Sequence, residues 1–332
     1  MEIDIKNISD IDINISDIDI NNLDDSLLKH VGSKLEDSEH LYTKPYSYWN
    51  TVVKKAFTNP IFLVCSFLII IFVILSASIA IGLPAIPGDV PVGTPANEPP
   101  SLEHWFGTGA NSEDMWNKLW IGSRTTLIFA MIIFAIQVVV GLLIGAIWGY
   151  YSRLDVVFIE IVRFISIIPS LILLIVVIFL FSKGQRPSTG VVIFAVSITS
   201  WIGLASIIRI QIMLTKNAEY NIASKVLGSR GPKIIKNNIL PKILPIIIQT
   251  CAFAIPEAIA IDSSLAYLGF GFVKTQDQAS LGSILNDVFA ETAWQSLPHL
   301  LIIPMGFVGG LSLAFYLMGK VLADSLDPKN HR

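Results

Sequence analysis

Six long apolar runs constrain the fold of this chain more than any other feature. They cover residues 61–83, 125–152, 164–182, 187–208, 243–267 and 296–319, and only the fifth contains charged residues. A helix needs about 20 apolar residues to cross the hydrocarbon core of a bilayer, and its backbone polar groups must be satisfied internally. The runs therefore predict an all-α membrane protein with six transmembrane helices.

The composition agrees with this prediction, because only 15 % of the residues are charged, against about 25 % in soluble proteins. Residues 1–44 differ from the rest. They are acidic and contain a seven-residue duplication at 8–14 and 15–21. We interpret them as a low-complexity cytoplasmic tail. The expected order is then an amphipathic helix at 45–60, the first span at 61–83, an external loop at 84–123, a core at 124–323 that contains the other five spans and the connection 209–242, and a C-terminal tail at 324–332.

Prolines and glycines within the runs predict how the helices bend and pack. Pro169 and Pro256 are expected to kink the third and fifth spans. Gly141, Gly145 and Gly149 repeat every four residues, which is typical of helices whose backbones approach closely. The glycines of the sixth run, at 306, 309 and 310, suggest packing in the same way.

The distribution of basic residues predicts the orientation in the membrane. The connection 209–242 carries seven Lys and Arg residues against Glu219 alone, whereas 84–123 has one lysine and five acidic residues. Because basic loops remain in the cytoplasm, the connection 209–242 is expected inside and 84–123 outside. This places both termini in the cytoplasm of a multi-pass plasma-membrane protein.

Sequence patterns of catalysis are absent. There is no Walker A run, no Gly-x-Ser-x-Gly and no His-Glu-x-x-His, and the five histidines do not pair at ligand spacing. Two cysteines within apolar runs support neither a disulfide framework nor a zinc site. We therefore expect a non-catalytic chain that binds no cofactor or metal, and we attribute its basic loop to topology rather than to nucleic acid.

Four charged residues are exceptions within or beside the apolar runs. Glu257 and Asp262 lie in the fifth run, where a carboxylate must face protein or water. Each is either a structural hydrogen-bonding group or part of the lining of a pathway. Glu160 and Arg163 have the spacing of an ion pair on one helix.

The connection 209–242 has a pattern of its own. Residues 219–227 have helical periodicity, with an apolar face formed by Ile222, Ala223, Val226 and Leu227. Gly228 stands where a helix end requires positive φ, and Gly231-Pro232 begins a second helix that leads into the fifth span. The first helix is either packed on the membrane bundle or a docking surface for a soluble partner.

This connection resembles the cytoplasmic loop of ABC importer permeases, which has the pattern Glu-Ala-Ala, three residues, Gly and a later Leu-Pro. The matching positions are Ala223, Ser224, Gly228, Leu240 and Pro241. Ile222 replaces the leading glutamate, and Glu219 lies one turn earlier. The resemblance implies that Glu219, Ile222, Ala223, Ser224, Leu227, Gly228, Leu240 and Pro241 couple the chain to an ATPase.

Further motifs resemble the C-type subunit of oligopeptide and dipeptide permeases. Before the second run the matches are His104, Phe106, Gly107, Thr108, Asp114, Lys118, Gly122, Arg124 and Leu127. Leu265 to Gly271 and Ser325 to Lys329 resemble two later motifs of that family, and 49–60 resembles its leading helix. The resemblance covers residues 45–330.

The resemblance implies half of a translocation pathway for peptides. The implied partners are a homologous six-helix permease, two ABC ATPases that bind ATP and Mg²⁺, an extracellular substrate-binding protein or lipoprotein, and membrane lipid. Nickel and glycan importers have similar subunits, so these substrates remain alternatives. An ion-coupled secondary transporter and a membrane scaffold or sensor are alternatives from the composition alone.

Overall fold

The computed structural model describes residues 48–79, 81–82, 95–183, 185, 187–271, 273 and 278–326. Within these residues the structure is all-helical apart from one isolated antiparallel bridge between Thr108 and Asp114. The described helices belong to one compact unit that begins at Tyr48. The predicted acidic tail lies outside the described residues, as does the C-terminal tail beyond Leu326.

The predicted membrane helices are confirmed. Five helical segments are long and apolar enough to cross a bilayer, and a bent pair brings the number to six when it is counted as one span. The segments are α2 (Pro60–Ile79), α3 (Met115–Tyr150), α6 (Thr189–Thr215), the stretch Gly231–Tyr267, and α12 (His299–Leu326). The bent pair is α4 (Ser152–Ile167) with α5 (Ser170–Ser182).

Pro169 produces a larger change of direction than a kink. The axes of α4 and α5 differ by 87° across the break at this proline, which stands immediately before α5 with an extended ψ of 131°. A proline ring prevents the preceding residue from continuing an α-helix. The predicted third span is therefore two helices at nearly a right angle.

The fifth span is also divided. Helix α9 (Leu240–Cys251) ends shortly before α10 (Ala254–Tyr267), and Pro256 lies in the first turn of α10. Proline has no N–H to donate to the carbonyl four residues earlier. The sequence predicted a kink of this span at Pro256, and the structure interrupts the helix nearby, at residues 252–253.

Helix α3 begins earlier than its apolar run. Asp114 is its N-cap and accepts a hydrogen bond from the main-chain N–H of Trp116 at 2.9 Å. The first turns of α3 therefore include Lys118, which the sequence prediction assigned to the loop 84–123. The charge of Lys118 is accommodated because two carboxylates neutralise it.

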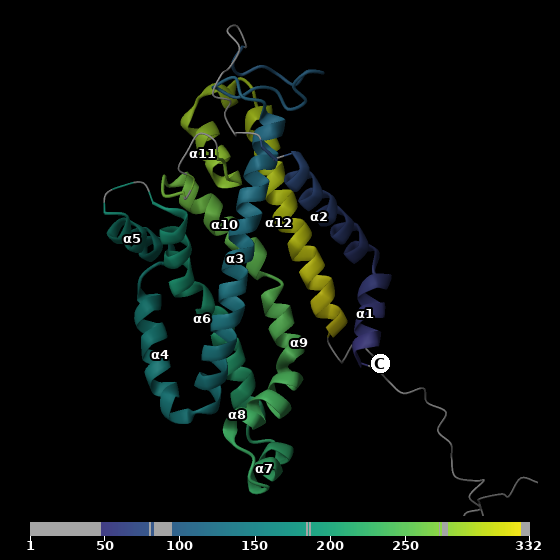
Figure 1. Ribbon diagram of the computed structural model, residues 1–332, viewed down its shortest axis with the longest axis vertical. Helices are drawn as coiled ribbons and strands as arrows, with labels where there is room; N and C mark the ends of the chain where they lie inside the picture. Colours follow the sequence, from purple (N-terminus) through teal and green to yellow (C-terminus); the bar gives the residue numbers. More distant parts are fainter. Residues whose placement is uncertain are drawn as a thin grey trace, which may run out of the picture. The chain divides into compact units, whose positions relative to one another are not determined.

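Helices α3 and α6 pack closely over a long stretch (Figure 1). A Cβ on Gly145 would lie 2.8 Å from the carbonyl oxygen of Ala205, and a Cβ on Gly149 would lie 2.9 Å from the Cα of Arg209. These glycines therefore set the distance between the two helices, as their spacing predicts.

The glycines of α12 do not behave in this way. A Cβ built on Gly306, Gly309 or Gly310 meets no atom within 4 Å. The prediction that they mediate packing is wrong for contacts within the described chain. Small-residue spacing permits close approach but does not supply a neighbouring helix.

Helix α11 (Leu281–Ala290) and helix α7 (Glu219–Val226) lie at opposite ends of the helical unit, and α3 extends between these two ends (Figure 1). Beside α12 lie α2 and α1 (Tyr48–Thr58). In α1, Val52 and Ala56 are buried, whereas Val53 and Phe57 are exposed. An exposed apolar face on a short helix suits the boundary of a membrane.

Candidate functional site

Helix α7 ends in a well-defined glycine cap. Gly228 has a φ of +85°, and the N–H of Ser229 donates to the carbonyl of Ser224 at 3.0 Å. The N–H of Gly228 donates to the carbonyl of Lys225, also at 3.0 Å. This is a Schellman arrangement, in which a left-handed residue satisfies the last carbonyls of a helix. The prediction of positive φ at Gly228 is confirmed.

The chain then returns toward the membrane helices without a further loop. Helix α8 (Gly231–Ile234), with Pro232 in its first turn, is followed by the π-helical segment Ile235–Ile239 and by α9. The predicted second helix is thus confirmed. Its buried isoleucines join residues of α3 and α6 in one apolar cluster, whose buried members are Ala146, Leu204, Ile208, Ile212, Ile234, Ile235, Ile239, Ile243 and Ile247.

Helix α7 packs on the rest of the chain through a polar residue. Asn221 is 2 % exposed, whereas the apolar residues Val226 and Leu227 are 81 % and 86 % exposed. Ile222 is 52 % exposed, and Ala223 beside it is exposed as well. The apolar face of α7 therefore points away from the rest of the described chain, which is the reverse of an ordinary surface helix.

Two side-chain contacts hold α7 in this orientation. The Nδ2 of Asn221 donates a hydrogen bond to the main-chain carbonyl of Thr215 at 2.9 Å. At Tyr220, the residue before Asn221, the Nζ of Lys242 from α9 lies 3.6 Å from the ring centroid. This is a cation–π distance. Helix α7 is thus connected to both α6 and α9.

The structure brings only some of the predicted coupling residues together. Glu219, Ile222, Ala223, Ser224, Leu227 and Gly228 lie on α7 and its cap. Leu240 and Pro241 begin α9 instead, and they line an apolar hollow of about 620 Å³ between α3, α9, α10 and α12. No charged residue is among those that line the hollow, so it offers no ionic contact to a ligand.

The two carboxylates of α10 have different environments. Asp262 is buried, and its Oδ2 accepts a hydrogen bond from Thr126 of α3 at 2.7 Å. The same Thr126 oxygen accepts a hydrogen bond from the N–H of Leu281 at 2.9 Å. Asp262 therefore joins α3, α10 and α11. Glu257, in contrast, is exposed on α10.

An ion pair near the α7 end was not predicted. Arg209 of α6 forms two hydrogen bonds with Asp155 of α4, one of them at 2.9 Å from Nη2 to Oδ2. The indole N–H of Trp148 also donates to Asp155 at 2.8 Å. The sequence analysis used Arg209 only as an indicator of topology, because no local pattern links it to Asp155. The predicted pair of Glu160 and Arg163 is confirmed at 2.9 Å and is exposed.

These contacts connect α7 with α6 and α9. Within the described residues, no group of three or more His, Cys, Asp and Glu side chains is arranged to hold a metal ion. Helix α7 thus presents an exposed apolar face, and the buried isoleucines that follow it pack against α3 and α6.

Comparison with known proteins agrees with this arrangement. The sequence profile of the family described as "Binding-protein-dependent transport system inner membrane component" matches residues 137–332. This region includes the C-terminal part of α3, all of α4 to α12 and the α7 loop. It covers more than half of the chain.

Curated relatives match over most of their own length. The oligopeptide transport system permease protein AmiD of Streptococcus pneumoniae is 34 % identical over 233 residues, which are 70 % of this chain and 73 % of the relative. The dipeptide transport system permease protein DppC of Bacillus subtilis is 33 % identical over 72 % of this chain and 73 % of the relative. The oligopeptide transport system permease protein OppC of Bacillus subtilis is 29 % identical over 93 % of this chain and 98 % of the relative.

Permease components of this kind are multi-pass subunits of the inner membrane and are not catalytic themselves. The profile match and the relatives show that the chain belongs to the family of inner membrane components of binding-protein-dependent ABC transport systems.

Proposed function

We propose that this chain is one of two homologous membrane subunits of an ATP-driven peptide importer. Its relatives include oligopeptide and dipeptide permease proteins, which supports a peptide substrate rather than nickel or a glycan. In this proposal the partners are a second permease, two ATPase subunits that bind ATP and Mg²⁺, and an extracellular binding protein.

One observation carries the proposed coupling to the ATPases. Helix α7 buries Asn221 and exposes Ile222, Val226 and Leu227, so an apolar face is left without a partner in the described chain. A helix that leaves such a face exposed is suited to insertion into an apolar groove of another protein. We assign this role to α7, with Gly228 ending the helix and Pro241 marking where the loop joins α9.

The proposed orientation follows from the basic residues. The loop that contains α7 lies on the cytoplasmic side, and α11 with residues 95–114 lies on the outer side. Both termini are then cytoplasmic. The positively charged loop 209–242 supports this assignment.

Glu257 has a role in the same proposal. It is exposed on a helix that crosses the membrane, and a carboxylate facing lipid there would be costly. We assign it to the water-filled pathway between the two permease subunits. Asp262 has a structural role in this proposal, because it is buried and hydrogen-bonded to Thr126.

Substitution on the exposed face of α7 tests the coupling role. Ala223→Asp places a carboxylate on this face without disturbing a buried contact of the chain. If the face becomes buried against an ATPase, an unpaired charge costs several kcal/mol, and we expect at least about tenfold less ATPase subunit to copurify. Asn217→Asp is the control, because it adds the same charge to an exposed position outside α7.

The amount of chain in the membrane should be equal for both variants. If Ala223→Asp retains the ATPase subunits and full peptide uptake in reconstituted vesicles, α7 is not the coupling helix.

A further inference from the structure

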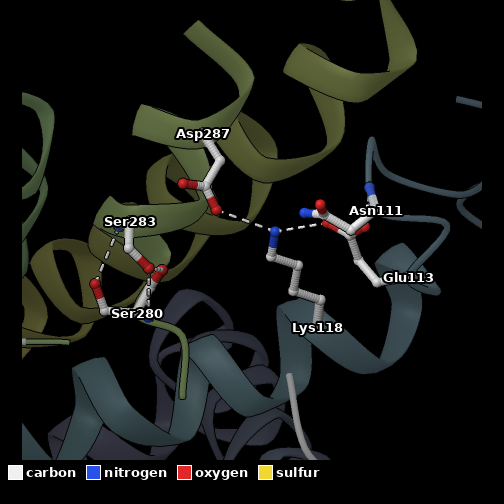
Figure 2. A network of polar contacts seen from close by, with 6 residues as sticks. All are labelled: Asn111, Glu113, Lys118, Ser280, Ser283 and Asp287. Atoms are coloured by element: carbon white, nitrogen blue, oxygen red, sulfur yellow. Dashed lines mark hydrogen bonds and ion pairs between the residues drawn. The ribbon is translucent and has the colours of Figure 1, made fainter. Parts of the chain in front are cut away.

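A buried lysine joins two segments at the α11 end of the molecule. The Nζ of Lys118 in α3 lies 2.7 Å from Oε1 of Glu113 and 3.1 Å from Oδ2 of Asp287. Figure 2 shows the lysine between these two carboxylates, which come from the segment before α3 and from α11. The side chains of Lys118 and Glu113 are 4 % and 3 % exposed, whereas that of Asp287 is 51 % exposed.

Glu113 is part of a tight turn in residues 95–114, which we name the outer loop. Its Oε2 accepts a hydrogen bond from the N–H of Asn111 at 2.8 Å, and its main-chain carbonyl accepts one from Gly109 at 2.8 Å. A Cβ on Gly109 would lie 2.4 Å from Oε1 of Glu113. The carboxylate is therefore enclosed by the outer loop, and Lys118 fixes that loop to α3.

Helix α11 is held against α3 at two points. Near its start, the N–H of Leu281 donates to Thr126 of α3. A capping box formed by Ser280 and Ser283 defines the same end (Figure 2). Further along, Lys118 binds Asp287. The lysine thus connects α11 with the outer loop as well as with α3.

Neutralisation of the Lys118 charge does not by itself explain why Asp287 also contacts this lysine. Glu113 already provides a buried counter-ion for Lys118, and Asp287 is half exposed to solvent. Among the described residues that line the small cavity here, Lys118 is the single cation, beside Glu113, Asp287 and Glu291. Burial and the charge of Glu113 raise the pKa of Glu291. Without the lysine, carboxylates of the outer loop and α11 would face one another and repel.

We infer that Lys118 is a positioning residue that makes the outer loop and α11 one rigid block on α3, through which the docked binding protein acts on the membrane helices. This inference rests on the proposed orientation and function. It assigns to the Lys118–Asp287 contact a role in transmission, in addition to its contribution to the fold.

The structure provides a continuous route from this block to α7. Helix α3 continues without interruption over 36 residues, and Gly145 packs it directly on α6. Helix α6 ends at Thr215, whose carbonyl accepts the hydrogen bond from Asn221 of α7. Packed elements of this kind carry coupling over such distances, and the coupling is demonstrated by perturbing one end and measuring at the other.

The experiment uses the complete transporter in lipid vesicles. Asp287→Ala removes the ion pair between Lys118 and α11 but leaves the buried pair of Glu113 and Lys118. Asp287→Glu retains a carboxylate as the conservative rescue. Glu160→Ala is the control, because it breaks an exposed ion pair elsewhere on the chain. The double variant Glu113→Gln with Lys118→Met removes the two buried charges together and leaves no buried carboxylate unpaired.

Two measurements are made. Spin labels on Asn111→Cys and Ala290→Cys, both exposed positions, report the distance between the outer loop and the end of α11 in a background without Cys65 and Cys251. The ATPase rate is measured without and with the transporter's binding protein, loaded with a tryptic digest of casein.

We expect Asp287→Ala and the double variant to broaden the distance distribution. We also expect them to lower the stimulation of the ATPase by about fivefold or more, with the unstimulated rate unchanged.

Asp287→Glu and Glu160→Ala should behave as the parent does. Unchanged stimulation in both the Asp287→Ala and the double variants overturns the inference. An equal loss of unstimulated activity and of assembly also overturns it, because the contact is then only structural. Failure of the parent chain to assemble with ATPase subunits refutes the proposed function instead.

Discussion

The side-chain amide of Asn221 donates a hydrogen bond to the main-chain carbonyl of Thr215, and this bond joins α7 to the end of α6. Thr215 is the last residue of α6, where carbonyl groups have no partner within the helix. The Thr215 carbonyl also accepts a hydrogen bond from the N–H of Ala218 at 3.0 Å, so Asn221 adds a second donor at the end of one helix while it orients the next. The apolar residues of α7 remain exposed as a result.

Removal of this amide should loosen α7 without unfolding the chain. For Asn221→Ala we expect a local loss of about 1 kcal/mol, which corresponds to roughly fivefold faster hydrogen exchange of the α7 amides. Hydrogen exchange followed by mass spectrometry on the purified transporter measures this directly. Asn217→Ala, at an exposed asparagine of the same loop, is the matched control. Equal exchange in the two variants would contradict the role of Asn221.

Gly228 offers a second test of the α7 loop, through its backbone alone. No atom lies within 4 Å of a Cβ at this position, yet φ is +85°. Gly228→Val should therefore cost about 1–3 kcal/mol through backbone strain, whereas Gly228→Asn should cost less, because asparagine tolerates the left-handed region. We expect peptide uptake to fall in the order glycine, asparagine, valine. If valine and asparagine give the same uptake, backbone strain at the cap does not control coupling.

The helices and caps of this loop could be predicted from sequence because their signals are local. Helical periodicity, Gly228 and Pro232 each specify the structure within a few residues of themselves. The orientation of α7 could not be predicted. A periodic pattern shows which residues share a face, but the partner of Asn221 is a main-chain carbonyl, which has no signature in the sequence.

Long-range ion pairs escaped prediction for a similar reason. Lys118 and Asp287 are 169 positions apart, and Arg209 and Asp155 are separated by 54. Hydropathy also begins an apolar run only after the last flanking charge, so the second span was expected to begin at Thr125, after Lys118 and Arg124. Only the folded chain shows that carboxylates from two other segments neutralise this lysine.

The ion pair of Arg209 and Asp155 should stabilise the contact between α4 and α6. Their side chains are 19 % and 22 % exposed, so screening reduces the loss expected for Arg209→Met to about 1–2 kcal/mol. Arg163→Met breaks an ion pair that is largely exposed, and its loss should be near zero. Thermal unfolding of the purified protein in detergent compares the two. Equal midpoints would show that the Arg209 pair contributes no stability.

Substitution of glycines distinguishes packed from open positions. Gly145→Ala would place a Cβ 2.8 Å from a main-chain oxygen of α6, and such overpacking costs about 1–3 kcal/mol. Gly306→Ala meets no atom within 4 Å and should be neutral or slightly stabilising, since alanine favours the helix. The thermal unfolding midpoint should therefore fall only for Gly145→Ala. A similar decrease for Gly306→Ala would mean that another subunit covers this face of α12.

Cysteine labelling tests the proposed orientation. Ser112 lies in the outer loop, and Ser229 follows α7, so single cysteines at these positions report opposite ends of the molecule once Cys65 and Cys251 are replaced. A membrane-impermeant maleimide applied to intact cells should label Ser112→Cys and leave Ser229→Cys unlabelled, because the basic loop 209–242 is retained in the cytoplasm. Permeabilised cells should label both. If intact cells label Ser229→Cys alone, the orientation is inverted, and α7 is then on the wrong side of the membrane to contact an ATPase.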